Sequence, residues 1–286
     1  MSTAGSTASV SSPTTAGRID GRLHGRSFDS LLIYGTIIIA ALPLAFLSPG
    51  WEPQLRLVLW LDLWLLGFHH VIATFTRLAF DRESLRENRK LLVELPIAVV
   101  IGTVALYALG GVLAIATVYL YWQWFHYMRQ SYGIERAYRF KGRAAGANDV
   151  GDLNGYVIYA TAIAAILWRS STGAELFIGM PVFMVPVPTF VAASALIIAG
   201  CMFSWWFVRT AGLVIRGEAS PEHFVFTLSH CVVFFMAYVY IENITHGWLV
   251  INIWHNAQYL LFVWFANNKK FGGKFGSNRP VISTLS

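Results

Sequence analysis

The sequence predicts an all-α, polytopic membrane helix bundle of about eight transmembrane helices, with both termini in the cytoplasm. Three observations lead to this prediction: an apolar composition, a series of long apolar stretches, and basic residues concentrated in alternate loops. Of the 286 residues, 56% are hydrophobic and only 13% are charged, whereas soluble domains carry about 25% charged residues. The mean hydropathy is +0.55. An ordinary soluble globule and a disordered chain are therefore excluded.

The chain begins with a polar segment, residues 1–28, that is rich in Ser, Thr, Ala and Gly. No short apolar core precedes a small-residue cleavage site there, so we expect a retained, disordered cytoplasmic tail and not a signal peptide. The transmembrane helical domain is expected at 29–268, and a second cytoplasmic tail at 269–286. We see no internal repeat and no separate soluble domain.

The apolar stretches are each close to the roughly 20 residues that a helical span requires. The first hairpin is expected to turn at the Ser-Pro-Gly sequence 48–50, and the second at Gly110-Gly111. The segment 171–187 carries three prolines and is expected to form an irregular outer loop that partly re-enters the membrane. The expected spans are 30–47, 55–78, 92–109, 112–133, 155–170, 188–213, 222–242 and 245–266.

The basic residues support a count of eight spans. Eight spans place both termini on one side, and that side then holds 19 of the 21 Lys and Arg residues, with only Arg56 and Arg169 opposite. The positive-inside bias predicts such an asymmetry for the cytoplasmic face of a cell (inner or plasma) membrane. The formal net charge of +6 therefore indicates orientation in the membrane, and no nucleic-acid partner is expected.

Polar side chains inside the expected spans point to a functional site, because an ionisable group in the bilayer is costly. At about 100° per residue, Asp62 and His69 share one stripe of their helix and His70 lies beside it. From a rise of about 1.5 Å per residue, the histidines of four spans lie roughly 10–16 Å inside the cytoplasmic helix ends, and His223 lies at the rim. The histidines at this common depth are His69, His70, His126, His230 and His255.

We predict that these histidines bind a metal ion, with His223 as a further candidate. Neutral imidazole is the commonest protein ligand for iron, copper and zinc. A single buried histidine is more often a hydrogen-bonded contact between helices, but five at one depth favour a metal site. Adjacent His69 and His70 diverge around the helix, so both can be ligands only in a wide or binuclear site. The residues expected to orient the ligands, the substrate or a bound oxygen species are Asp62, Gln130, Asn252, Asn256 and Tyr259.

Three segments that carry these polar residues look like family signatures: GFHHVIATFTR, WFHYMRQSYGIERAYR and NIWHNAQYLLFVWFANN. With the expected spans, they make residues 30–266 resemble the integral-membrane non-haem iron oxygenases. Two groups are similar: the membrane desaturase and hydroxylase superfamily, and the Brp/Blh-type carotene dioxygenases. The resemblance is architectural, because the chain has neither the HxxxH box of the first group nor a close copy of the histidine-glycine motifs of the second. It assigns no role to a particular residue.

The leading hypothesis is an integral-membrane oxidoreductase that uses histidine-bound iron, mono- or binuclear, and O2 to oxidise or cleave a lipophilic substrate from the lipid phase. A reaction that needs electrons would require a separate donor protein, whereas a dioxygenase would need none. One alternative is a b-type haem protein that exchanges electrons with a quinone. The other is a proton- or metal-coupled transporter, or a membrane scaffold, in which Asp62 and the histidines relay protons.

Overall fold

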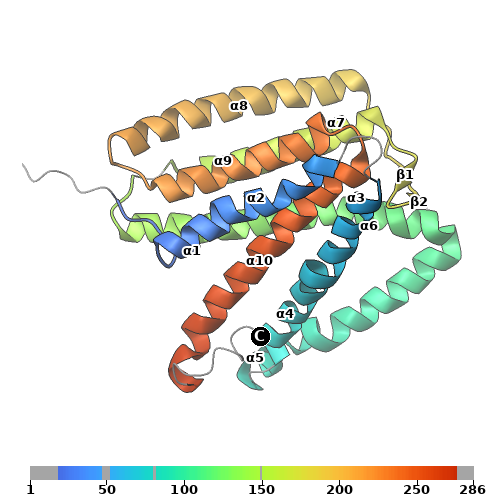
Figure 1. Cartoon of the computed structure of the whole chain (residues 1–286), viewed down its shortest axis with the longest axis horizontal. Coiled ribbons are helices and arrows are strands. Elements are labelled where there is room, and N and C mark those ends of the chain that lie inside the picture. Colours follow the sequence, from blue (N-terminus) through green and yellow to red (C-terminus); the bar gives the residue numbers. More distant parts are fainter. Residues whose placement is uncertain (1–18, 47–51, 80–81, 149, 276–286) are drawn as a thin grey trace, which may run out of the picture.

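The computed structural model describes residues 19–46, 52–79, 82–148 and 150–275. These residues form a mostly helical molecule in which the second half of α6 lies alongside α7, α8 and α9, while α10 and the α3–α4 helix are inclined to them (Figure 1). The predicted all-α class is confirmed in this coarse form. The expected turn at 48–50 falls outside the described residues.

Long helices account for nearly all of the regular structure, and four of the described helices include a short π-helical stretch. The α1–α2 helix and the α3–α4 helix each contain one, a third leads into α6, and a fourth extends α9. The elements in chain order are α1 (Arg26–Ser30), a π stretch (Leu31–Gly35), α2 (Thr36–Ala40), a 3-10 turn (Leu42–Phe46), α3 (Glu52–Leu61), a π stretch (Asp62–Gly67), α4 (Phe68–Ala79), α5 (Arg82–Glu87), a π stretch (Lys90–Glu94), α6 (Leu95–Ala144), α7 (Leu153–Thr172), β1 (Leu176–Phe177), β2 (Met180–Pro181), α8 (Thr189–Ile215), α9 (Pro221–Phe235), a π stretch (Met236–Tyr240) and α10 (Ile244–Phe275).

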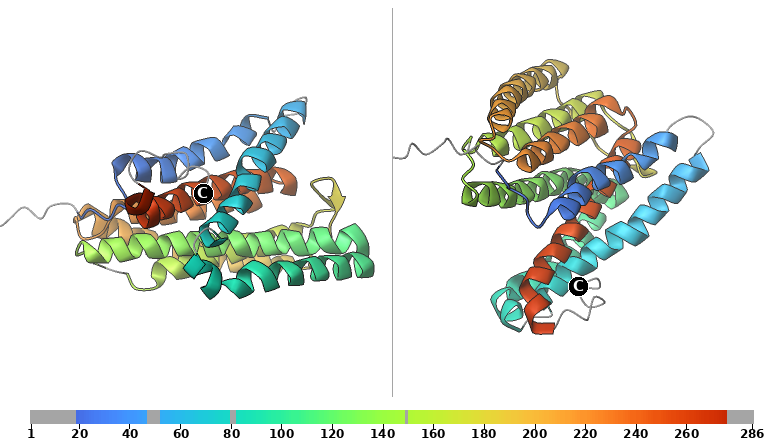
Figure 2. Two further views of the ribbon diagram at one scale, coloured as in Figure 1. Left: turned by 90° about the horizontal axis from the view of Figure 1, so that it is seen from below. Right: turned by 60° about the vertical axis from the view of Figure 1, so that its left-hand side comes forward.

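Helix α6 consists of two limbs that meet at Gly111. This residue has φ 61° and ψ −151°, a conformation that is open to glycine but not to residues with a Cβ atom. The chain reverses there without an intervening loop. The two limbs diverge from the bend in Figure 1 and look parallel only when seen from below (Figure 2, left). The predicted turn at Gly110-Gly111 is therefore confirmed. The first limb exposes its apolar side chains, and Leu109 near its end is 87% exposed.

Five helical stretches in the described part of the chain are long and apolar enough to cross a membrane. The third of them contains the bend at Gly111 and therefore both limbs of α6. Helices α7 and α10 occupy the positions of two further expected spans, but each carries several polar side chains in the interior of the molecule. The five stretches are Arg26–Phe46, Glu52–Ala73, Lys90–Ala144, Thr189–Ile215 and Pro221–Tyr240.

The main core is aromatic and lies between the second limb of α6 and helices α7, α9 and α10. Trp124, Tyr238, Trp248 and Trp254 are each at most 1% exposed. The indole of Trp124 meets the Tyr238 ring edge-on, with 5.2 Å between the ring centres. Such edge-to-face pairs contribute beyond the area that they bury, so this core fixes α6, α9 and α10 against one another.

The segment 171–187 is more regular than the predicted irregular loop. Strands β1 and β2 pair antiparallel through two residues each. The turn between them has positive φ at both central residues, 51° at Ile178 and 75° at Gly179, as hairpins with two-residue turns require. Phe177 is buried and meets Trp248 edge-on, with ring centres 5.4 Å apart. The apolar contact with α10 explains why this proline-rich segment is ordered.

Arg169 supports the chain reversal between α9 and α10. Its guanidinium is 4% exposed, and it donates to the carbonyl oxygen of Glu242 at 2.5 Å and also to that of Ile241. We expect Arg169→Met to lower the free energy of unfolding by about 3 kcal/mol, because the charged hydrogen bonds are lost and two carbonyls are left without a donor. Thermal unfolding in detergent measures the change. The matched variant Arg56→Met, at an exposed position of α3, should leave the midpoint unchanged, and equal midpoints for both variants would contradict the prediction.

Candidate metal centre

Three histidines from three helices converge in the structure. His70 of α4, His126 of α6 and His255 of α10 each offer one ring nitrogen, and these atoms all lie within 4.8 Å of one another. The ring centres are 5.8 Å apart for His70 and His126, 5.0 Å for His70 and His255, and 4.8 Å for His126 and His255. His255 is 2% exposed, and the other two are half-buried. We call these three residues the histidine cluster.

The π-helical stretch Asp62–Gly67 decides which member of the histidine pair joins the cluster. A straight α-helix would align Asp62 with His69, since seven residues make two turns at about 100° per residue. The i→i+5 bonding of a π-helix advances the backbone more slowly, so the aligned residue comes one position later, at His70. The side chain of His69 is exposed instead, with Nδ1 at 3.3 Å from the Trp64 carbonyl oxygen. The predicted shared stripe of Asp62 and His69 is therefore wrong.

A buried carboxylate and two amides lie directly beside the cluster. Asn252 donates from Nδ2 to Asp62 at 2.5 Å, and Asn256 donates to the other carboxylate oxygen at 3.4 Å. The Tyr127 hydroxyl donates to Oδ1 of Asn252 at 2.7 Å, which fixes the orientation of that amide. Asp62 is 3% exposed. Its two oxygens accept from the asparagines that flank His255 on α10.

The remaining predicted orienting residues also contact the cluster. Gln130, one turn along α6 from His126, donates to the backbone carbonyl of His255 at 2.8 Å and so ties α6 to α10. The ring of Tyr259 lies over that of His70, with 4.0 Å between the ring centres. The side chains of α10 at 252, 255, 256 and 259 thus act together from one helix face, as their spacing predicts.

Two predicted ligands, His230 and His223, lie elsewhere on α9. His230 is completely buried, and its Nε2 lies 3.0 Å from the carbonyl oxygen of Ile158 on α7. His223 lies near the start of α9, where its Nε2 is 3.0 Å from a carboxylate oxygen of Glu135. The structure therefore separates both residues from the histidine cluster. The interhelical hydrogen bond of His230 is the common role of a single buried histidine in a bundle.

Tyr127 belongs to the site and was not among the predicted residues. It is completely buried, its ring centre is 4.5 Å from that of His255, and its hydroxyl holds Asn252. The sequence gives only a weak signal for this role, because Tyr127 follows His126 directly and adjacent residues on a helix point about 100° apart. Its inclusion depends on where α10 packs against α6.

Comparisons with protein-family models, with curated proteins and with solved structures find no match to this chain. The chemistry of the cluster therefore rests on its own donor set. Neutral imidazoles suit iron, copper, zinc and nickel. Nitrogens bound at about 2.0–2.1 Å to one ion lie about 3–3.5 Å apart. The three nitrogens lie within 4.8 Å of one another and would have to come closer to bind one ion together. The donor types fit a single metal ion.

Proposed function

We propose that the protein is an integral-membrane oxidoreductase that holds iron with His70, His126 and His255 and uses O2 to oxidise or cleave a lipophilic substrate. The observation that carries the proposal is the convergence of three imidazoles, from helices far apart in sequence, beside a buried carboxylate. A single buried histidine needs no ligand to explain it, whereas three imidazole nitrogens within 4.8 Å of one another form the donor set of a metal site.

Three protein ligands leave coordination positions open, which is the pattern of catalytic and not of structural metal sites. Bound iron would supply one-electron chemistry with O2, and the cluster favours the mononuclear alternative. The chain's own residues provide the rest. Asp62, through Asn252 and Asn256, fixes the face of α10 that carries His255, and Gln130 holds the backbone at that residue. Tyr259, stacked on His70, is placed to orient a substrate.

The proposal includes eight passes through the inner or plasma membrane and a cytoplasmic position for both termini. The support for this arrangement is the segregation of basic residues, with 19 of 21 on the side that carries both ends. A site between membrane helices suits acyl chains, alkanes or isoprenoids that arrive from the membrane lipids, and it limits the access of bulk water to a reactive centre. A reaction that consumes electrons would take them from a separate donor protein.

The b-type haem alternative finds less support in the geometry. Two axial histidines of a haem stand on opposite faces of a wide, flat macrocycle. Here each imidazole of the cluster lies close to the other two, and Tyr259 covers His70 at 4.0 Å. No two of these rings are far enough apart to hold a haem macrocycle between them.

The transporter alternative also finds less support. A transporter built on Asp62 would need a mobile carboxylate, whereas Asp62 accepts hydrogen bonds from two asparagines.

Metal analysis of the purified protein tests the proposal. We expect the full chain, produced with iron supplied and purified in detergent, to contain about one iron atom per chain and to lack the sharp visible bands of a bis-histidine haem. His126→Ala should lose most of the iron, because two imidazoles alone rarely retain an ion during purification. The matched variant His69→Ala changes an exposed neighbour of the cluster and should retain it.

Two results would overturn the proposal. Iron at background level in the unmodified protein would exclude the metal centre, and equal losses in His126→Ala and His69→Ala would exclude the assigned ligands. Proton or metal flux into proteoliposomes that is abolished by Asp62→Asn, without any bound metal, would support the transporter instead. Lipid extracts of cells with and without the protein then identify the substrate class.

A further inference from the structure

A second buried polar centre lies away from the histidine cluster, near the start of α9. Glu135 of α6 is 1% exposed, and one of its carboxylate oxygens is 3.0 Å from Nε2 of His223. Asn154 of α7 approaches the same ring nitrogen at 3.3 Å, and the Trp206 indole of α8 donates to Asn154 at 2.6 Å. Four helices thus contribute one side chain each to this centre, which we call the Glu135–His223 pair after its titratable members.

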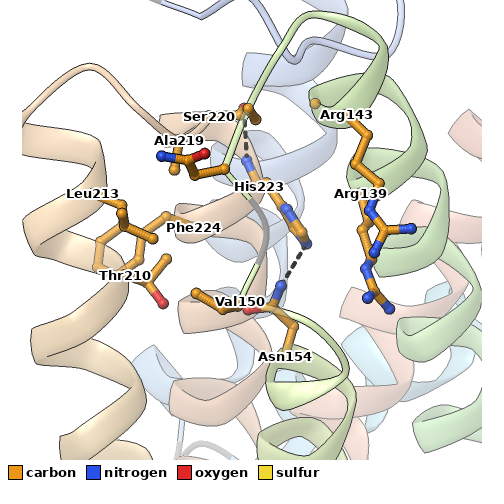
Figure 3. Close-up of a pocket in the computed structure, with 13 residues that line it drawn as sticks. Arg139, Arg143, Val150, Asn154, Thr210, Leu213, Ala219, Ser220, His223 and Phe224 are labelled. Carbon is orange, nitrogen blue, oxygen red and sulfur yellow. Dashed lines mark hydrogen bonds between the residues drawn. The ribbon is translucent and has the colours of Figure 1, made fainter.

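A small cavity leads to the pair from the end of the bundle where α6 and α8 end and α7 and α9 begin (Figure 3). Its volume is about 20 Å³, which is enough for one water molecule. His223 and Asn154 line it, together with Thr210, whose hydroxyl is buried and has no hydrogen-bond partner among the described residues. A water molecule in the cavity would satisfy Thr210 and reach the imidazole.

The charges around the pair come from several elements. Arg139, one turn along α6 from Glu135, donates to Asp152 at 2.5 Å, and this hydrogen bond lowers the pKa of the Asp152 carboxyl. Arg143 lines the cavity. From α9, Glu222 accepts a hydrogen bond from Ser220 at 3.1 Å. The Tyr138 ring of α6 lies parallel to that of His223, 6.3 Å away. Basic side chains thus line the cavity, and the buried acid Glu135 contacts its lining residue His223.

Buried polar atoms without hydrogen-bond partners among the described residues also occur on the turns of α6, α9 and α10 next to the pair and to the histidine cluster. The carboxylate oxygen of Glu135 that does not contact His223 is one of them. Ile134, Phe226 and Leu261 pack in one cluster, and this contact brings the next turns of α6, α9 and α10 to the same level. The unpartnered atoms of these turns are Thr227 Oγ1, His230 Nδ1, Gln258 Nε2, Gln258 Oε1 and Gln130 Oε1.

Unpartnered polar atoms in a membrane interior are expensive, and ordered water is their usual partner. His230 shows the pattern clearly: its Nε2 contacts a carbonyl oxygen and so carries the proton, which leaves Nδ1 as an acceptor facing no donor. His223, Thr227 and His230 share one face of α9 at spacings of four and three residues. Along α6, the distance from Glu135 to His126 is about 13 Å at 1.5 Å per residue.

We propose that the Glu135–His223 pair relays protons from the cytoplasmic cavity to the histidine cluster. His223 takes a proton from water in the cavity and passes it to the near oxygen of Glu135. The protonated carboxyl group then rotates, and the same oxygen gives the proton up to water and to the polar side chains that lead inward. This inference rests on the proposed function and makes it more specific.

The reaction served by the relay is one that consumes protons, RH + O2 + 2 e⁻ + 2 H⁺ → ROH + H2O. A separate one-electron donor protein supplies both electrons. A dioxygenase would need no such path.

Infrared spectroscopy of the full, metal-free protein tests the pair independently of iron. A relay must exchange its proton with water, so the infrared bands of the Glu135–His223 pair that respond to N–H and O–H deuteration should shift within seconds of transfer to D2O. The Glu135 bands should be missing from Glu135→Gln and unchanged in the matched variant Glu222→Gln. A pair that is closed to water would shift only over minutes to hours, and that result would overturn the proposal whether or not the protein binds iron.

Proton uptake tests the connection to the cluster. Iron-loaded protein is reduced chemically and mixed with O2 in the presence of a pH-indicator dye. A positioned acid–base group contributes about 10²–10⁴ in rate, so proton uptake in Glu135→Gln should be at least tenfold slower, with unchanged iron content, whereas Glu222→Gln behaves as the unmodified protein. Equal rates in all three proteins would refute the relay. Absence of iron would refute the proposed function, while the infrared result would still decide whether the pair exchanges protons.

Discussion

Gly247→Ala is expected to destabilise the protein strongly, because the added methyl group has no room. Gly247 lies in the first turn of α10, and a Cβ atom there would overlap the backbone carbonyl of Ala237 in the π stretch after α9. A backbone carbonyl cannot rotate away as a side chain can, so the two helices would have to separate. We expect a loss of about 3 kcal/mol or more, seen as a thermal midpoint roughly 10 °C lower in detergent.

The matched control is Gly102→Ala in the first limb of α6. Gly102 is also helical, but a Cβ atom there would meet nothing within 4 Å. Replacing an open helical glycine by alanine stabilises by roughly 0.5–1 kcal/mol, so the midpoint should stay or rise slightly. If Gly247→Ala and the unmodified protein had the same thermal midpoint, α9 and α10 would not approach closely at Ala237.

Removal of the Asp62 carboxylate should weaken both stability and metal binding. In Asp62→Leu, the buried amides of Asn252 and Asn256 lose their acceptor, at a cost of about 1–3 kcal/mol for each unsatisfied group. Both amides flank His255 on α10, so the imidazole loses its fixed position. Loss of a residue that orients ligands typically costs 10–100-fold in metal affinity, and we expect a loss of that size in iron titrations of the metal-free protein.

A graded series of variants separates the loss of iron affinity from a general loss of stability. Asp62→Asn retains one acceptor oxygen and should lie between the unmodified protein and Asp62→Leu in both midpoint and affinity. Glu94→Gln, which removes an exposed carboxylate at the start of α6, should change neither. Full iron affinity in Asp62→Leu, at a lowered midpoint, would mean that Asp62 stabilises the bundle without positioning His255.

The sequence was sufficient for the helical fold and for the turn at Gly111, because both depend on local properties. Apolar runs of span length form helices in the structure, and the glycine pair permits a backbone that other residues avoid. The hairpin at Ile178 and Gly179 was missed, because its order comes from contacts with α10. The number of spans and the side that carries the termini stay predictions.

The residue types of the candidate site were predictable from the sequence, whereas its membership was not. Axial depth follows from the helical rise, which is the same for every α-helix. The direction in which a side chain points depends on local winding and on the packing of neighbouring helices. The π stretch exchanges His69 for His70, and the packing of α9 against α7 turns His230 toward the Ile158 carbonyl. Neither the π stretch nor the packing of α9 against α7 produces a periodic pattern in the sequence.

The order of the three histidines along the chain has a consequence for biosynthesis. His70 and His126 leave the ribosome well before His255, which lies within the last helix of the described chain. Domains generally fold as units during and after synthesis, and a site made of segments from across the chain exists only when the final one has docked. Loading of the proposed ion would therefore be a late maturation step, and chains arrested before α10 would lack it.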